Sequence, residues 1–323
     1  MDRRELLMLW AATAVLGVMS TRPASAQSLQ LVFVHGRSQQ GRSSDEIKAE
    51  WLGALQKGAE AIGRVLPIDL DVAVPFYGDK LDEFARAFEI PLTSDIHTRG
   101  DETQDEFLEF QADLAEQVRV RAGVTDAEID MEYGDNPRQR GPQNWEWVQA
   151  ILRALDKHSS VASRVTLETF TRDVFLYTRR QGVRDEIDGI VGGALTEQPT
   201  IVVAHSLGSV VAYNVLRTDR RNLQVPLYLT VGCPLGVRAV RDQLRPLKFP
   251  AHVKAWYNAL DPRDVVALYP LDSQNFPITP AVENYAKVQN HTDNRHGIVG
   301  YLDNAEIVGH ILGSLADLSK IVR

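Results

Sequence analysis

The sequence has few of the features that define several protein classes. It contains a single cysteine, Cys233, which has no partner for an internal disulfide bond and is expected to be a buried thiol. It contains no run of lysine and arginine and has a formal net charge of -8, so neither nucleic acid nor an anionic membrane surface is expected as its main partner. No internal repeat or low-complexity segment occurs in its 323 residues. Disordered chains and small disulfide-rich folds are excluded, and a large globular core is expected.

A long hydrophobic run is also missing. The apolar run at the N-terminus, residues 6–18, is shorter than the ~20 residues that a membrane-spanning helix needs. It lies between Arg3 and Arg4 on one side and the small residues 24–26 on the other, which is the order of a secretory signal peptide. We expect cleavage to remove residues 1–26, leaving no integral membrane segment, and the mature chain to be exported to the periplasm or the medium. A retained anchor and an ordinary N-terminal helix are the alternatives.

Short apolar runs bounded by turn residues predict the strands of one sheet. A helix capped by Asp45 is expected after the first strand, and a helix beginning near Ala305 is expected to close the chain. Strands that alternate with helices predict an α/β fold with a mostly parallel sheet flanked by helices on both faces. The expected strands lie at residues 29–34, 71–75, 200–204, 227–231, 252–257 and about 282–288.

Between the second and third expected strands the apolar spacing is helical throughout. We therefore divide the mature chain into a core, residues 27–79 and 197–323, and a helical insertion, residues 80–196. The apolar faces of these helices need a partner, and the nearest uncovered surface is the carboxyl edge of the sheet, so the insertion is expected to form a cap there. Its clearest helical patterns lie at residues 107–118, 145–155, 165–177 and 183–195.

The third expected strand leads directly into a serine between small residues and then into an apolar helical run. A nucleophilic serine on a sharp strand-to-helix turn needs small residues two positions before and after it, and Ala204 and Gly208 meet this need around Ser206. The turn, which also contains His205, would expose the Ser206 hydroxyl above the carboxyl edge of the sheet and direct the helix N-terminus at the bond under attack. Ser206 is therefore the expected nucleophile. The alternative is an ordinary serine in a turn.

The segment of residues 201–213 resembles the nucleophile elbow of lipases, phospholipases and esterases in the α/β-hydrolase superfamily, with Ala204 where glycine is usual. The resemblance extends over residues 29–77 and 197–320 and implies the α/β-hydrolase fold. It also implies a pair of backbone amides that bind the oxyanion of the reaction, here the amides of Arg37 and Leu207. His35, at the same strand end as Arg37, is expected to be a structural histidine bonded to loop backbone.

The resemblance further implies an acid and then a histidine after the serine, and the chain offers two candidates for each. Family members commonly place the acid before an apolar pair, which matches Asp264, and Asp261 is the fallback. The usual base is a loop histidine followed after a few residues by tyrosine, which matches His296, and His291 in the same loop is the fallback. The triad implied by the resemblance is Ser206, Asp264 and His296.

These residues imply a serine hydrolase that cleaves a carboxylic ester, of a small molecule or a lipid, through an acyl-enzyme. The alternatives are a catalytically inactive hydrolase fold that serves as a binding module and, among enzymes, an acyltransferase or a peptidase. Histidines and carboxylates form no cluster at metal-ligand spacing, so neither a metal nor another cofactor is expected. The sequence indicates neither the acyl chain length nor the oligomeric state.

Overall fold

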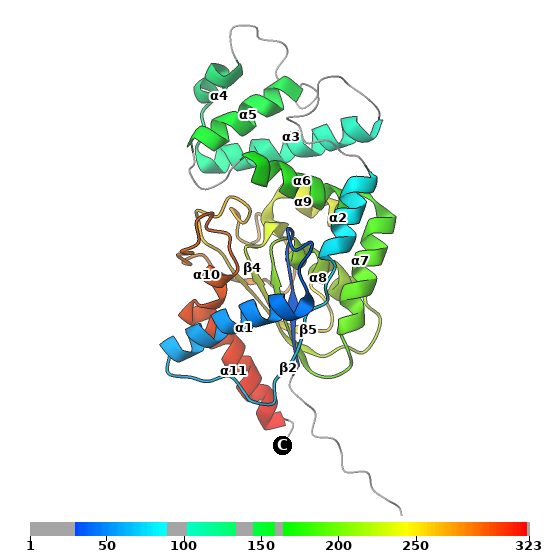
Figure 1. The fold of residues 1–323 in the computed structure, drawn as a ribbon, viewed down its shortest axis with the longest axis vertical. Coiled ribbons are helices and arrows are strands. Elements are labelled where there is room, and N and C mark those ends of the chain that lie inside the picture. The colour runs from blue at the N-terminus through cyan, green and yellow to red at the C-terminus, as the bar shows by residue number, and fades with distance from the viewer. Residues whose placement is uncertain (1–29, 89–101, 134–144, 159–163, 322–323) are drawn as a thin grey trace, which may run out of the picture.

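The computed structural model describes residues 30–88, 102–133, 145–158 and 164–321 (Figure 1). The expected signal peptide, residues 1–26, lies outside the described residues, so its removal stays a prediction. Within the described ranges, no helix combines the length and the apolar character that crossing a membrane requires.

A six-stranded sheet lies at the centre of the protein, with the strand order β2-β1-β3-β4-β5-β6. Neighbouring strands are parallel in every pair, which confirms the α/β class and the parallel sheet predicted from the sequence. All strands therefore have their carboxyl ends at one edge, where ligands bind in open α/β sheets. The strands are β1 (Gln30–Val34), β2 (Asp71–Ala73), β3 (Thr200–His205), β4 (Val225–Val231), β5 (Val253–Ala259) and β6 (Glu283–Tyr285).

Helices cover both faces of this sheet, as the alternation predicts. Leu31 and Phe33 of β1 belong to an apolar cluster with α1, α10 and α11, whereas Val32 and Val34 belong to a second cluster that includes α8. Alternate residues of the strand thus enter different layers, because side chains along a strand point to opposite faces. The helices outside the insertion are α1 (Ser44–Ala61), α8 (Leu207–Thr218), α9 (Arg238–Arg241), α10 (Val299–Leu302) and α11 (Ala305–Ile321).

The N-cap of α1 is Ser43, so the expectation of Asp45 as the cap is wrong. The Ser43 hydroxyl accepts a hydrogen bond from the Glu46 amide, and the Glu46 carboxylate accepts one from the Ser43 amide. This reciprocal capping box satisfies two amides that an aspartate two positions later could not satisfy. Asp45 instead lies in the first turn, where its charge favours the helix dipole.

In the described parts of the insertion the secondary structure is helical. Figure 1 shows α3, α4, α5 and α6 stacked beyond the sheet, with α2 and α7 beside it. Phe175 of α6, Val210 of α8 and Trp256 of β5 belong to one continuous apolar cluster. The insertion therefore packs on the sheet through a shared core. Its helices are α2 (Gly78–Ala87), α3 (Glu102–Ala122), α4 (Asp126–Tyr133), α5 (Trp145–His158), α6 (Arg164–Arg179) and α7 (Gln181–Ala194).

Candidate active site

Ser206 lies between β3 and α8 on a strained turn. Its backbone has φ 55° and ψ -130°, a region that residues other than glycine rarely adopt. The surroundings hold this conformation, because the Ser206 amide donates to the Val231 carbonyl at 3.1 Å and the Ser206 carbonyl accepts from the Ser209 amide at 2.9 Å. The serine is thus held at the carboxyl edge of the sheet, next to the N-terminus of α8.

Glycines allow the end of β1 to pack directly against this turn. A Cβ atom at Gly208 would overlap the carbonyl oxygens of Val34 and His35. A Cβ atom at Gly36 would lie 2.8 Å from the Cβ of Ser206, closer than real Cβ contacts come. The small residues around Ser206 therefore bring the backbone after β1 into contact with the turn.

The Ser206 hydroxyl begins a hydrogen-bonded chain that ends at a buried carboxylate. Its Oγ lies 2.8 Å from Nε2 of His296, and Nδ1 of His296 lies 2.7 Å from Oδ2 of Asp264. The Asp264 side chain is fully buried, and that of His296 is 14% exposed. When Nδ1 donates its proton to the carboxylate, Nε2 of the neutral ring can accept the proton of the serine.

The two fallback residues have other partners. His291, with a side chain 55% exposed, places its Nε2 2.9 Å from Oδ2 of Asp303. Asp261 is fully buried and accepts hydrogen bonds from the amides of Asn290 and Arg263, each at 2.8 Å. The structure thus brings together Ser206 and the favoured acid and base, and it places both fallback residues outside that hydrogen-bonded chain.

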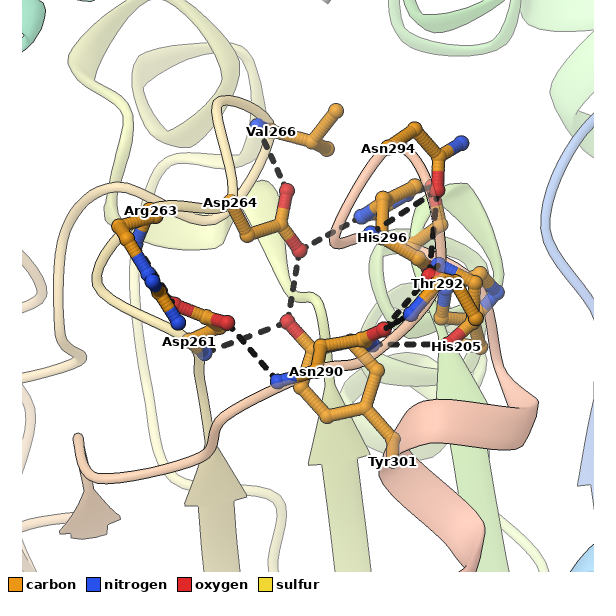
Figure 2. A network of polar contacts seen from close by, with 12 residues as sticks. His205, Asp261, Arg263, Asp264, Val266, Asn290, Thr292, Asn294, His296 and Tyr301 are labelled. Carbon is orange, nitrogen blue, oxygen red and sulfur yellow. Dashed lines mark hydrogen bonds and ion pairs between the residues drawn. The ribbon is translucent and has the colours of Figure 1, made fainter. Parts of the chain in front are cut away.

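Asp264 is held by donors other than the histidine. Its Oδ2 accepts a hydrogen bond from the Tyr301 hydroxyl at 2.6 Å, and its Oδ1 accepts one from the Val266 amide at 2.9 Å (Figure 2). Burial raises the pKa of Tyr301, so its hydroxyl remains a donor. From the sequence, Tyr301 serves only as the tyrosine that follows the expected loop histidine, and no bond to the acid is predicted for it. Its bond to the acid depends on how α10 packs against the loop after β5, which no local pattern reveals.

Asn290 closes the loop that carries His296. Its Nδ2 donates to the Gly297 carbonyl at 2.8 Å, and its Oδ1 accepts from the Thr292 amide at 3.0 Å. Its own amide donates to Oδ2 of Asp261, so the fallback acid anchors the start of the loop (Figure 2). Asn290 is not predicted from the sequence, because a buried asparagine in a polar loop has no distinctive local signal.

His205 contacts His296 from the end of β3. Its Nε2 donates to the His296 carbonyl at 2.7 Å, and the two ring centroids lie 4.7 Å apart. Burial lowers the pKa of His205 to about 3, which keeps the ring neutral near pH 7. Gly232, with φ +58°, leaves room for both rings, since a Cβ there would lie 2.9 Å from Cε1 of His296. His205 thus helps to support the backbone of the histidine loop.

The two amides expected to bind an oxyanion belong to the segments that meet at Ser206. Leu207 is the first residue of α8, and Arg37 follows Gly36 in the loop after β1. Among the described residues, no hydrogen-bond acceptor is found for either amide. Arg37 also lines the cavity beside Ser206, and Leu207 directly follows the serine in the chain.

His35 makes the contacts with loop backbone that the sequence predicts. Its Nδ1 donates to the Gly36 carbonyl at 2.7 Å, and its Nε2 accepts from the Tyr77 amide at 3.1 Å. Burial lowers the pKa of His35 to about 4, so the ring is neutral near pH 7. This neutral ring joins the loop after β1 to the segment that precedes α2.

A cavity of about 300 Å³ lies beside the serine and is lined by residues of both the core and the insertion. Ser206 and His296 contribute its reactive groups, and Trp51 and Val266 contribute apolar surface. Phe170 of α6, which is 2% exposed, also lines it. The insertion thus borders the space next to the serine.

Metal and thiol chemistry have no clear basis in the described ranges. No group of three or more histidine, cysteine, aspartate or glutamate side chains there could hold a metal ion. Cys233 is buried, and its burial raises the pKa of the thiol to about 11. The thiol is thus in its unreactive protonated form at neutral pH.

Comparison of the sequence with protein-family models gives no match, and comparison with curated proteins gives no significant similarity.

Proposed function

We propose that the protein is a serine hydrolase of the α/β-hydrolase fold that cleaves carboxylic esters, with Ser206 as nucleophile, His296 as base and Asp264 as acid. The observation that carries this proposal is the continuous hydrogen-bonded chain, with 2.8 Å between Ser206 and His296 and 2.7 Å between His296 and Asp264. Both distances are within the reach that proton transfer needs. The strained turn at the serine and the two available amides support the same assignment.

In the first half of the reaction, Oγ of Ser206 attacks the ester carbonyl carbon and passes its proton to Nε2 of His296. The carbonyl π electrons move to the oxygen, and the amides of Arg37 and Leu207 stabilise the resulting oxyanion. Collapse of this intermediate breaks the bond to the alcohol oxygen, which takes the proton from His296. Asp264 orients the imidazole and stabilises its charged form. The products are a free alcohol and an acyl ester of Ser206.

In the second half, a water molecule gives one proton to His296 while its oxygen attacks the acyl carbon. The new tetrahedral intermediate collapses with loss of Oγ of Ser206, which takes back the proton held by His296. The carboxylic acid leaves, and the enzyme returns to its starting state. One ester and one water are thus converted into one acid and one alcohol.

The cavity favours an ester with a small acyl group. Its volume of about 300 Å³ lies at the lower end of the range for ligand pockets, about 300–1,000 Å³. Trp51, Val266 and Phe170 provide apolar contacts for a short alkyl chain, and a longer chain would extend past these contacts. We therefore expect hydrolysis of p-nitrophenyl esters to fall as the acyl chain grows from acetyl to dodecanoyl.

Labelling with a small fluorophosphonate tests the proposal directly. The folded protein should acquire one phosphonyl group, mapped to Ser206 by peptide mass spectrometry, and Ser206→Ala should acquire none. Ser319→Ala is the matched control, because this hydroxyl only donates to the Leu315 carbonyl within α11. A folded protein that is neither labelled nor able to cleave any ester would instead support the binding-module alternative.

A further inference from the structure

The loop after β1, residues 36–42, carries the proposed oxyanion donor at Arg37, and helices between β2 and β3 hold it. The Gly41 amide donates to Oδ1 of Asp79, in the first turn of α2, at 2.7 Å. Nε of Arg37 donates to Oδ2 of Asp173, in α6, at 3.2 Å. The position of the 36–42 loop therefore depends on residues of α2 and α6.

The contact between this loop and α6 is a buried ion pair. The side chains of Arg37 and Asp173 are 17% and 8% exposed. Burial lowers the pKa of Arg37 and raises that of Asp173, and in each the opposite charge of the partner counteracts that effect. Arg172 also reaches the carboxylate, with its Nε 3.4 Å from Oδ1 of Asp173. Such a pair adds little net stability, and its chief effect here is to fix the loop relative to α6.

Phe170 and Asp173 lie on the same face of α6, because residues three positions apart in a helix are neighbours. Phe170 lines the cavity that contains Ser206, while Asp173 binds the side chain of Arg37 at the edge of this cavity. One face of α6 thus contacts both the space for the substrate and the loop that carries the amide.

We propose that Asp173 is a positioning residue for ester hydrolysis, because its bond to the Arg37 side chain holds the Arg37 amide where the oxyanion forms. This inference rests on the proposed function, since it presumes that an oxyanion develops beside Ser206. Asp173 itself touches no reacting atom. A misdirected oxyanion donor weakens transition-state binding far more than substrate binding, so losing the carboxylate should lower kcat and leave KM nearly unchanged.

The test compares Asp173→Ala, Arg37→Ala and the double variant in steady-state hydrolysis of an activated short-chain ester. Each single variant should lower kcat about 10- to 100-fold, with KM changed less than about twofold. The double variant should lose no more than the worse single variant, because all three lack the same contact. Affinity for an alkyl boronic acid, whose serine adduct mimics the tetrahedral intermediate, should fall by a similar factor.

Stability measurements separate positioning from a purely structural role. Asp173→Ala leaves the buried Arg37 charge without its partner and should lower Tm, and Arg37→Ala leaves Asp173 with Arg172 alone and should lower Tm less. The double variant removes both charges of the pair and should regain part of the loss seen in Asp173→Ala. Positioning predicts that kcat stays low in the double variant while Tm recovers. Recovery of kcat together with Tm would overturn the proposal. Asp173→Asn, which keeps an acceptor for Nε of Arg37, should have a kcat between those of Asp173→Ala and the wild type, and wild-type kcat in Asp173→Ala would also overturn it.

Glu132→Gln is the matched control. The Glu132 carboxylate is 14% exposed and pairs with Lys157 at 2.6 Å, between α4 and α5 and outside the cavity lining. Its loss should leave kcat and boronate affinity unchanged. If the wild type is active but Asp173→Ala and Glu132→Gln have equal kcat, only the positioning role is refuted. A wild type that is neither labelled nor active would refute the proposed function as well.

Discussion

Two loops at the carboxyl edge of the sheet carry groups of the candidate site, and different parts of the chain hold them. The loop of residues 290–297, which carries His296, is spanned by the Asn290 side chain and anchored by Asp261, both outside the insertion. The loop of residues 36–42 is held by Asp79, in the core, and also by Asp173, inside the insertion. Changes in the insertion should therefore affect oxyanion binding and substrate choice while leaving the base in place.

The largest effect is expected from the 290–297 loop itself. His296→Ala should lower kcat about 10⁴-fold or more, because among the described residues only the His296 ring is hydrogen-bonded to the Ser206 hydroxyl. Circular dichroism should show an intact fold, since the ring belongs to a surface loop. His291→Ala, in the same loop, should retain kcat within about twofold, because its partner is Asp303. An inactive His291→Ala with an active His296→Ala would assign the base to His291.

The two aspartates should differ sharply in what they contribute. Asp264→Asn should lower kcat about 10³- to 10⁴-fold, because the amide can no longer orient and stabilise a charged imidazole. Asp261→Asn should lower kcat less than about tenfold but reduce Tm, because it weakens a buried anchor of Asn290. Measuring kcat and Tm for both variants checks the ranking, and the reverse order would assign the acid to Asp261.

A smaller effect is expected from Tyr301→Phe, which removes one donor to Asp264. Without this donor the carboxylate is held less firmly against His296, so kcat should fall on the order of tenfold. Substrate affinity should be unchanged, because Tyr301 is fully buried and does not line the cavity. Equal kcat for Tyr301→Phe and wild type in stopped-flow acylation would show that the other donors to Asp264 suffice.

Within the insertion, Phe170→Ala should change which esters are accepted more than it changes the reactivity of Ser206. The enlarged cavity should raise relative kcat/KM for longer acyl esters several-fold, because each added methylene in an apolar pocket contributes about 1 kcal/mol. Labelling by a small fluorophosphonate should proceed at nearly the wild-type rate. An unchanged ester profile would show that the insertion contributes no selectivity through this residue.

The last prediction concerns stability: the free energy of unfolding should depend on pH through His35, which directly precedes the 36–42 loop. Burial lowers its pKa from 6.5 to about 4, so between these values the unfolded chain takes up a proton that the folded protein does not. The free energy of unfolding should therefore fall as pH drops from 7 to 4, by on the order of 3 kcal/mol for this residue. Urea unfolding of His35→Gln should show a shallower decline over this range, and an equal slope in both proteins would contradict the assignment.

The features predicted correctly from the sequence are those that depend on residues close together in the chain. The strand period, the small residues around Ser206 and the helical spacing of the insertion each involve neighbours within a few residues. A short pattern was also overlooked: Thr125 and Glu128 form a capping box in which each amide is bound by the other side chain, and this box begins α4. The same pattern at Ser43 and Glu46 identifies the cap that was wrongly assigned to Asp45.

The α/β class, the strand positions and the serine on a sharp turn follow from local sterics and periodicity, which can be read from neighbouring residues. Which aspartate and which histidine lie in line with Ser206 depends on tertiary packing, since His296 and Asp264 are 32 residues apart and His296 and Ser206 are 90. The bond between Asp173 and Arg37, 136 residues away, depends on the same packing. Such distant partners meet only when the sheet and its helices pack, and no spacing in the chain encodes their distance.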